Sequence, residues 1–484
     1  MTRTTTQHIG TEFTMEFGRY RQQARPYLTK TKGSRCTHPP FKPPRLARHA
    51  PRHPHRRRRH LRPRPRNPTP ALRGGAKAYR ITVVERCESL RTGGQQIDLR
   101  AQGIPVMRKL GLMDAVRDIV VHERGMAFVD KHGTPQFQFG VNDTGKGPQG
   151  ATSEYELMRG DLVRVLYDAS LQASKEAKNQ GGSGVTYEFG VTVETISQKE
   201  DGEGGVDVKL SDGRSQHFDL VIGADGQGSR TRRQAWGEEA GRAAFHTLHS
   251  YAAYFTIPRV ESEDSDIAVV HHLSGRRMIA FRANNRPETQ CYLFCNEPSQ
   301  GPLLRDATGY NPAKTVEDQK KIWRDFFDDS DAWCRERVFD GLANTKDFYA
   351  HEAGQVKLDS WSRGRVALLG DAGYCPSPIT GCGTTASLVG AYVLAGELSR
   401  HPGDVSAALE GYDQVLRPFI NEVQKLMPGA PTIAAPQTDW GIWFMHSLGK
   451  FVTTLKIDKL ALSLLPADKG GLPLPEYPEL KLAE

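Results

Sequence analysis

Cysteine is scarce and scattered in this chain of 484 residues. Its seven cysteines are odd in number, and none belongs to a CxxC pair or to a histidine cluster at metal-ligand spacing. This pattern argues against a disulfide framework and a structural zinc site and indicates a reducing compartment, so we expect a cytoplasmic protein without a metal ion. The chain also lacks an apolar run near the ~18 residues of a membrane-spanning helix, and its N-terminus lacks the apolar core of a signal peptide.

Acidic residues are nearly absent from residues 1–70. This segment holds 18 of the 65 lysines and arginines but only two acids, Glu12 and Glu16, whereas the remaining chain carries 47 basic and 54 acidic residues. The formal net charge of +9 therefore comes from one segment, whose arginine and proline content predicts disorder, and we expect no nucleic-acid partner. Two alternatives stay open for this segment: a natural basic tail that binds RNA or an acidic surface and, against its proline density, a mitochondrial transit peptide.

Regular strand and helix patterns begin near residue 79. The short β-branched run ITVVE at 81–85 predicts a buried parallel strand, and FDLVIGADG and GRVALLGDAG (364–373) each contain a further apolar strand that ends in a turn. The region 251–295 alternates like antiparallel strands. Parallel strands that are interrupted by an antiparallel block and then resumed predict an α/β nucleotide-binding domain with an inserted sheet. We assign 71–120, 153–240 and 345–400 to the nucleotide-binding domain, 121–152 and 241–344 to the inserted substrate domain, and 401–484 to a C-terminal helical region.

Three motifs carry the chemistry expected of such a fold. Glu85 ends the strand ITVVE, where a carboxylate can accept hydrogen bonds from ribose hydroxyls. Asp225 follows the strand in FDLVIGADG, among glycines that allow close backbone approach to a pyrophosphate. The most specific motif, RVALLGDAGYCPSPITGCGTTASL, delivers Asp371 from a buried strand and leads through Gly381 and Gly383 into a helix whose free amides favour an anion.

In this order the motifs resemble those of the class A flavin monooxygenases, the para-hydroxybenzoate hydroxylase-like superfamily, and within it the tetracycline-destructase-like and fungal secondary-metabolism branch. The resemblance covers roughly residues 71–430. It implies an FAD/NAD(P)-binding Rossmann-like domain of the glutathione-reductase type, an inserted antiparallel substrate sheet and C-terminal helices. It also implies that NAD(P)H reduces FAD and that one oxygen atom of O2 passes to a small organic substrate, possibly aromatic or of polyketide type, in secondary metabolism or detoxification.

The same resemblance implies a set of cofactor-binding residues. Glu85 and Arg86 would bind the adenosine end, Arg100, Gln102 and Arg159 would lie near the flavin, Asp225 near the pyrophosphate, Asp371 at the ribityl chain, and Pro378, Gly381 and Gly383 along the isoalloxazine. No catalytic side chain and no metal ligand is implied, because the reactive group belongs to the cofactor.

The inserted sheet is expected to wall the substrate. The candidates from its alternating strands are Tyr254, His271, His272, Met278 and Phe281, and simple sheet packing is the favoured alternative for each of them. The apolar segment WGIWFMHSLGKFVTTL (440–455) is interpreted as a helix that packs across the two domains, with contact to a membrane surface as the alternative. Oligomeric state is not readable from the sequence.

The chain departs from the family pattern at its front. The family begins with an apolar strand and a GxGxxG loop that binds the pyrophosphate, and no such motif precedes residue 81. Further departures are Ala372, Gly373 and Tyr374 where Ala-Ala-His is common, and Thr384 where asparagine is common, and they leave the substrate class open.

A shift of reading frame accounts for the missing motif. When the codons of residues 53–69, HPHRRRRHLRPRPRNPT, are read one nucleotide later, they can spell ILIVGAGISGPALATLL, with glycines at the places of Arg57, Arg59 and Arg62. Without that loop we expect a gap at the centre of the sheet with unpaired strand edges, neither strand nor glycine loop within 39–70, and weak or absent FAD binding. The alternatives are a non-catalytic flavoprotein remnant or basic-tail adaptor, and a flavin halogenase or reductase on the same scaffold.

Overall fold

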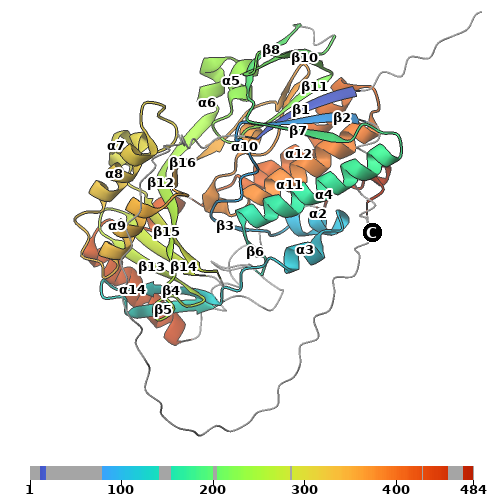
Figure 1. Ribbon diagram of the computed structural model, residues 1–484. Coiled ribbons are helices and arrows are strands. Elements are labelled where there is room, and N and C mark those ends of the chain that lie inside the picture. The colour runs from blue at the N-terminus through green and yellow to red at the C-terminus, as the bar shows by residue number, and fades with distance from the viewer. Residues whose placement is uncertain are drawn as a thin grey trace, which may run out of the picture. The chain divides into compact units, whose positions relative to one another are not determined.

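A parallel sheet forms where the sequence predicts buried β-branched strands. The computed structural model describes residues 11–17, 79–140, 154–199, 204–283, 286–427, 429–455 and 473–482. All of these residues belong to one compact unit, Met1–Tyr20 with Thr69–Glu484. None of the residues of the second unit, Arg21–Pro68, is among those described. The strand order is β17-β18-β11-β1-β2-β7, parallel except at β17 (Figure 1). The strands are β1 (Thr11–Phe17), β2 (Tyr79–Glu85), β7 (Val185–Phe189), β11 (Leu220–Ala224), β17 (Ser362–Arg363) and β18 (Val366–Leu368).

Strand β1 occupies the place where the family's first strand is expected. Its seven residues pair in parallel with β2, from Thr11 beside Tyr79 to Phe17 beside Glu85, and it also pairs with β11. Our expectations of a gap at the centre of the sheet and of disorder throughout residues 1–70 are therefore wrong for Thr11–Phe17. Residues 39–70, for which we expect neither a strand nor a glycine loop, lie outside the described residues.

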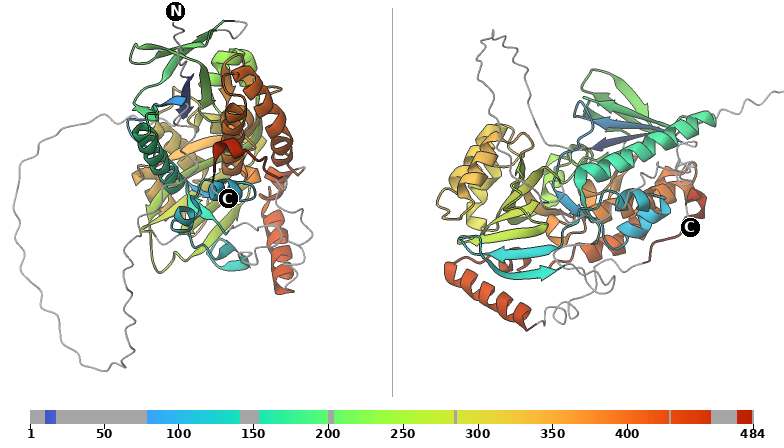
Figure 2. Two further views of the ribbon diagram at one scale, coloured as in Figure 1. Left: turned by 90° about the vertical axis from the view of Figure 1, so that its right-hand side faces the viewer. Right: turned by 60° about the horizontal axis from the view of Figure 1, so that its bottom comes forward.

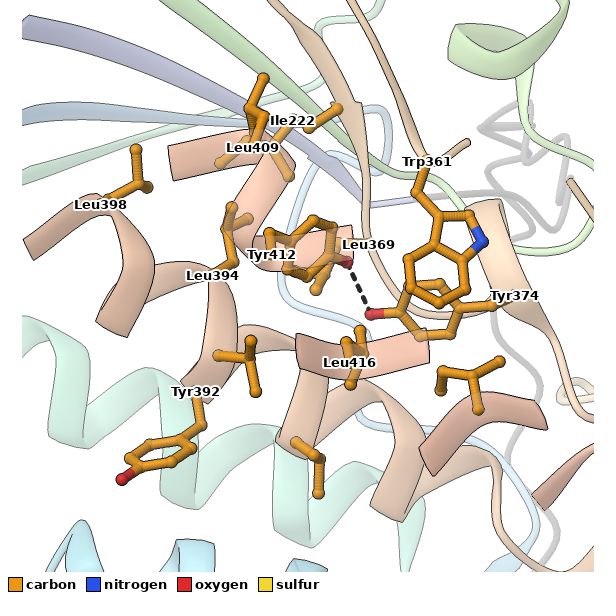
Figure 3. Packing of buried hydrophobic residues seen from close by; sticks show 14 of the residues in the cluster. Ile222, Trp361, Leu369, Tyr374, Tyr392, Leu394, Leu398, Leu409, Tyr412 and Leu416 are labelled. Carbon is orange, nitrogen blue, oxygen red and sulfur yellow. Dashed lines mark hydrogen bonds between the residues drawn. The ribbon is translucent and has the colours of Figure 1, made fainter. Parts of the chain in front are cut away.

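Helices α11 (Gly383–Arg400) and α12 (Val405–Val423) cover one face of this sheet and build a large apolar core (Figure 3). Within it the rings of Trp361 and Tyr374 lie 4.8 Å apart, and the Tyr412 hydroxyl lies 2.9 Å from both the Tyr374 hydroxyl and the Leu368 carbonyl oxygen. Tyr374, where the family often has histidine, is fully buried. The tyrosine side chain that replaces the histidine therefore packs in the apolar core.

The inserted domain is a seven-stranded sheet of order β16-β12-β15-β14-β13-β4-β5, antiparallel except between β13 and β4. Its outer face packs on α7 (Gly301–Asp306), α8 (Val316–Phe326) and α9 (Arg335–Asn344) (Figure 2). The inner face, as we name it, carries Ala252, Tyr254, Val270, Ala280, Tyr292 and Tyr349. The strands are β4 (Gly125–Val129), β5 (Pro135–Gly140), β12 (Phe245–Pro258), β13 (Ile267–Leu273), β14 (Arg277–Ala283), β15 (Glu288–Cys295) and β16 (Tyr349–Val356).

Smaller elements complete the unit. The sheet of β8 (Val193–Gln198), β9 (Val206–Leu210) and β10 (Ser215–Phe218) packs on the other face of the parallel sheet, and β3 (Gln96–Asp98) pairs with β6 (Glu156–Met158). The remaining helices are α2 (Gly103–Lys109), α3 (Met113–Arg117), α4 (Arg159–Asn179), α5 (Arg230–Trp236), α6 (Glu238–Ala243), α10 (Asp371–Tyr374), α13 (Ala430–Ile433), α14 (Asp439–Thr454) and the short 3-10 turns η2 (Pro298–Gln300), η3 (Pro378–Thr380) and η4 (Pro478–Leu480).

Helix α14 contains most of the apolar segment noted in the sequence. It contacts β5 and β13, with Gly449 against the Phe137 ring. Its other side leaves large apolar side chains exposed, among them Trp440, Trp443 and Phe451. Among the described helices, none combines the length and hydropathy needed to cross a membrane.

Candidate functional site

One edge of the parallel sheet collects the carboxyl ends of β2, β11 and β18. The register places Glu85 and Ala224 on either side of Phe17, and Gly223 beside Leu368. The chain therefore delivers Glu85, Asp225 and Asp371 to the same edge, which is where open α/β sheets bind their ligands. The three acids of the sequence motifs, far apart along the chain, thus follow strands that end at one edge of the sheet.

The segment after Asp371 enters α11 through an unusual backbone. Ser377 has φ of 83°, although it carries a side chain, and Gly381 has φ of 65°. Helix α11 then begins at Gly383 behind Cys382, whose side chain makes no capping hydrogen bond. Because the first amides of a helix have no acceptor within it, the first N–H groups of α11 can donate hydrogen bonds to an anionic or carbonyl oxygen from outside the helix.

Arg100 lies against this segment. A Cβ atom at Gly381 would come within 3.3 Å of Cζ and Nη1 of Arg100, and the Thr385 hydroxyl donates to the Arg100 carbonyl oxygen at 2.7 Å. Arg100 pairs with Asp98 at 2.6 Å, but its buried Nε has no hydrogen-bond partner within the part of the chain that the structure describes. Gln102, at the start of α2, is buried beside the same helix start. The structure thus brings Arg100 and Gln102 to the segment that holds Gly381.

Asp371 faces the start of α11. Its Oδ1 lies 4.0 Å from the position that a Cβ atom of Gly383 would take. Burial raises the pKa of this carboxyl group, while a hydrogen bond with the Cys375 thiol and the charge of Arg159 lower it. Arg159, at the first position of α4, therefore acts on the same site. Pro378 opens η3 and is exposed.

Glu85 and Arg86 lie at the opposite end of this edge, after β2. The Glu85 Oε1 accepts a hydrogen bond from the backbone N–H of Cys87 at 2.8 Å, which fixes the carboxylate at the turn. Both side chains are half-buried. In dinucleotide-binding folds, an acidic residue at the end of the second strand binds the ribose hydroxyls, and Glu85 has this position.

Asp225 is already occupied by protein groups. One carboxylate oxygen accepts from the Ser229 hydroxyl, and the other accepts from the backbone N–H groups of Arg230 at 2.6 Å and Thr231 at 3.0 Å. Asp225 therefore holds the first turn of α5. Sequence reasoning missed the consequence: Arg232 of this helix is buried and donates to the Ala372 carbonyl oxygen at 2.7 Å, which ties α5 to the turn that carries Asp371.

Replacing Asp225 by alanine is expected to destabilise the protein by about 1–2 kcal/mol, because two helix N–H groups and one buried hydroxyl lose their acceptor. Chemical denaturation of D225A against the unsubstituted chain measures this loss. The D225N variant keeps one acceptor oxygen and should recover part of the stability. An unchanged unfolding midpoint for D225A would contradict this role.

Two of the five substrate-wall candidates point the wrong way. His271 and Phe281 lie on the outer face of the seven-stranded sheet, where both contact the Trp333 ring. His272 is on the inner side but is covered by α14, because its Nδ1 lies 3.2 Å from His446 Nε2. Tyr254 belongs to the inner-face cluster, and Met278 packs against it.

His351 is a residue of the inner face that the sequence did not single out. Its ring stacks on Tyr254 with 5.4 Å between centroids and lies 6.4 Å from the ring of Tyr349. It is 8% exposed, and within the described part of the chain its ring nitrogens form no hydrogen bond. Burial and the charge of Arg159 lower the pKa of His351 to about 4, so the imidazole is neutral at neutral pH.

A buried ionic cluster joins the inner face to the two-stranded sheet of β3 and β6. Arg282 donates from Nε to Glu123 at 2.9 Å and from Nη2 to both oxygens of Glu156 at 2.8 and 2.9 Å. Gln96 also donates to both carboxylates. The four residues, which we call the Arg282 cluster, come from β14, β3, β6 and the segment before β4.

Glu156 gives this cluster a pH dependence. Burial raises its pKa to about 8, the charge of Arg282 opposes this, and the charges of Glu123 and Asp98 add to it. Since the folded pKa lies above the unfolded value near 4.5, the stability that protonated Glu156 contributes to the fold is complete below about pH 4.5 and is lost as the pH rises toward 8.

We expect E156Q, which cannot ionise, to lose less thermal stability than the unsubstituted chain between pH 6 and pH 9. Parallel melting curves for the two proteins across this range would contradict the assignment.

Residues 76–425 match a family model described as an FAD binding domain. The chain is 42% identical over 410 residues to the FAD-dependent monooxygenase asL6 of Sarocladium schorii, covering 83% of this chain and 93% of that protein. It is 34% identical over 388 residues to the monooxygenase CTB7 of Cercospora beticola, covering 79% and 88%.

Among solved structures, the tetracycline destructase Tet(51) superposes with a TM-score of 0.63 at 27% identity, covering 84% of this chain and 95% of that one. HpxO of Klebsiella pneumoniae, solved with FAD and uric acid, superposes with a TM-score of 0.56 at 19% identity, covering 81% and 92%. The second likeness shows a shared fold. The α/β fold with an inserted sheet is confirmed.

Proposed function

Because the chain belongs to the FAD-dependent monooxygenases, we propose that it uses NADH or NADPH and O2 to oxygenate a small organic molecule of aromatic or polyketide type in secondary metabolism or detoxification. The oxidoreductase class and FAD as cofactor follow from the family. The choice of nicotinamide and the kind of substrate are the proposal. The observation that carries it is the start of α11, where Cys382 provides no side-chain cap, beside the buried Nε of Arg100, which has no hydrogen-bond partner among the described residues.

The residues of the site fit the ring end of FAD. The helix start at Gly383 offers amides and positive dipole character, which would favour the negative charge that a reduced flavin carries at its pyrimidine edge. Arg100 Nε is a buried donor in need of an acceptor. Asp371 would accept a hydrogen bond from a ribityl hydroxyl, and Glu85 from a ribose hydroxyl.

The pyrophosphate end fits less well. In dinucleotide folds a glycine-rich loop directly after the first strand cradles the pyrophosphate. Here β1 ends at Phe17, and the sequence between it and β2 contains no GxGxxG motif. Asp225, the other candidate at this end, uses both carboxylate oxygens on α5. The pyrophosphate therefore lacks its usual partners in this chain.

The inner face supplies a binding surface for a planar substrate. Tyr254, Tyr292 and Tyr349 form an aromatic group there, with ring centroids of Tyr254 and Tyr349 4.9 Å apart. Such rings stack on other planar systems and exclude water. The neutral imidazole of His351 can donate or accept one hydrogen bond, which would orient a hydroxyl or carbonyl group of the substrate.

The chemistry divides between cofactor and protein. When bound, FAD supplies electron transfer from the nicotinamide and activation of O2. The protein binds and orients the substrate on the inner face, keeps water away, and holds positive charge at Arg100 and Arg159 near the ring.

Oxygen-dependent turnover tests this proposal. Purified chain supplied with FAD is mixed with NADH or NADPH and planar hydroxylated aromatics, with and without O2, and products are analysed by mass spectrometry. We expect nicotinamide oxidation that requires O2 and products that gain one oxygen atom, labelled when 18O2 is used. Products that gain a halogen atom when halide is added would support a halogenase. Absence of turnover even with stoichiometric bound FAD would support a non-catalytic remnant.

A further inference from the structure

The Arg282 cluster lies where the substrate sheet meets the segments that carry Arg100 and Arg159. Glu123 and Glu156 are 8% and 1% exposed, so water cannot satisfy the oxygen atoms of their carboxyl groups. Arg282 satisfies both carboxylates at once, and its planar fork suits this task better than a lysine would. The cluster thus connects β14 of the substrate sheet to β3 and β6 of the nucleotide-binding domain.

Backbone hydrogen bonds extend this connection along β3. The Gln96 N–H lies 3.0 Å from Gln290 Oε1 and 3.1 Å from the Tyr292 hydroxyl on the inner face. Two residues later, Asp98 pairs with Arg100 at 2.6 Å. Arg100 in turn lies within 3.3 Å of the Cβ position of Gly381. A continuous series of contacts therefore runs from Arg282 to the loop at the start of α11.

The other strand of the pair leads to Arg159. Glu156 begins β6, and Arg159 follows directly as the first residue of α4. The Arg159 N–H donates to the Gln95 carbonyl oxygen at 3.1 Å. Gln95 directly precedes Gln96, the first residue of β3. Both arginines assigned to the flavin therefore depend on strands that Arg282 fastens.

We propose that Arg282 is a positioning residue, which fixes β3 and β6 on the substrate sheet and thereby sets the places of Arg100 and Arg159 relative to the Gly381 loop. It acts through Glu123, Glu156 and Gln96 and does not itself contact cofactor or substrate. Naming the flavin as the ligand rests on the proposed function, whereas the mechanical coupling does not.

Hydrogen–deuterium exchange on the chain without added FAD tests the coupling directly. In R282M we expect exchange to rise about tenfold in peptides covering β3 and the loop from Pro378 to Gly383. R277M is the matched control, because Arg277 lies on the same strand with a side chain that is 10% exposed against 14% for Arg282, but its guanidinium pairs with Asp329 and the Phe326 carbonyl oxygen. R277M should raise exchange around α8 and leave β3 and the loop unchanged.

Equal exchange of β3 and the loop in R282M and R277M would overturn the proposal. If R282M does not fold, E123Q removes one charged acceptor and keeps Arg282, and an increase in the same two regions is then expected; no local change in E123Q would also overturn it. R282K should give an intermediate increase, since a lysine cannot hold both carboxylates as a fork. Because none of these measurements uses FAD, a failure here is separate from a failure of the proposed activity.

Discussion

Restoring the shifted reading frame is expected to convert a chain that binds FAD poorly into one that copurifies with it. The shifted codons of residues 53–69 can encode an apolar strand and GAGISG, which is the GxGxxG pattern of the pyrophosphate loop. Each charge-assisted hydrogen bond to a phosphate is worth about 1.5–3 kcal/mol. Two of them together correspond to at least about a hundredfold in affinity, and this is the gain that we expect in FAD affinity.

The measurement is the flavin absorbance per protein after purification, together with a titration of added FAD. The frame-corrected chain should be yellow at near-equimolar flavin, and the chain as printed should be nearly colourless. The matched control is the corrected chain with its three loop glycines replaced by alanine, which keeps the strand and loses the close backbone approach. Equal FAD content in the printed and corrected chains would contradict the interpretation.

The shifted frame also supplies its own beginning. If His49 is encoded by CAT, the frame one nucleotide later reads ATG there, because Ala50 supplies the G. The strand ILIV would then follow that methionine after three residues. Sequencing the gene and its transcript across these codons decides the matter, since AGA codons for Arg57 and Arg59 would place an acidic residue in the shifted frame where the motif needs glycine.

Gly160→Ala is expected to destabilise the protein by about 3 kcal/mol or more. A Cβ atom at Gly160 would lie 1.7 Å from the Thr92 carbonyl oxygen and 2.4 Å from its carbonyl carbon, and neither backbone atom can move without displacing the loop before β3. Overpacking of this kind commonly costs 1–3 kcal/mol, and a clash between two backbones lies at or above the upper end.

Gly93→Ala is the matched control for this prediction. Gly93 follows Thr92 in the same loop, and a Cβ atom there meets nothing within 4 Å. Denaturant unfolding should therefore leave G93A within about 0.5 kcal/mol of the unsubstituted chain. If G160A unfolds at the same denaturant concentration as G93A, the packing of α4 on this loop is not as described.

The sequence predicted the local structure of residues 366–385 well because that structure lies in one continuous segment. Residues 366–385 combine a buried strand, a glycine-rich turn and a helix start, and each has its own local signal. The edge that joins Glu85, Asp225 and Asp371 also followed, because parallel strands align their carboxyl ends. The sequence did not predict that Asp225 accepts hydrogen bonds from α5, because an Asp-Gly turn can bind either a ligand or the start of a helix.

Other features depend on contacts that no local pattern encodes. In the run AVVHHL a shift of one residue moves a side chain to the other face, so His271 and His272 could not be told apart. Arg282 meets its partners 126 and 159 residues away in the chain. Strand β1 was missed because its seven residues lie within a segment whose composition predicts disorder.

The central claim is that Asp371, the Gly381 loop and the start of α11 seat the isoalloxazine ring. A crystal structure of the frame-corrected chain with bound FAD tests it most directly. We expect electron density for the pyrimidine edge of the ring against the amides that follow Cys382, with Arg100 beside it and the adenosine near Glu85. Density for the ring elsewhere, with these amides facing only solvent or protein, would contradict it.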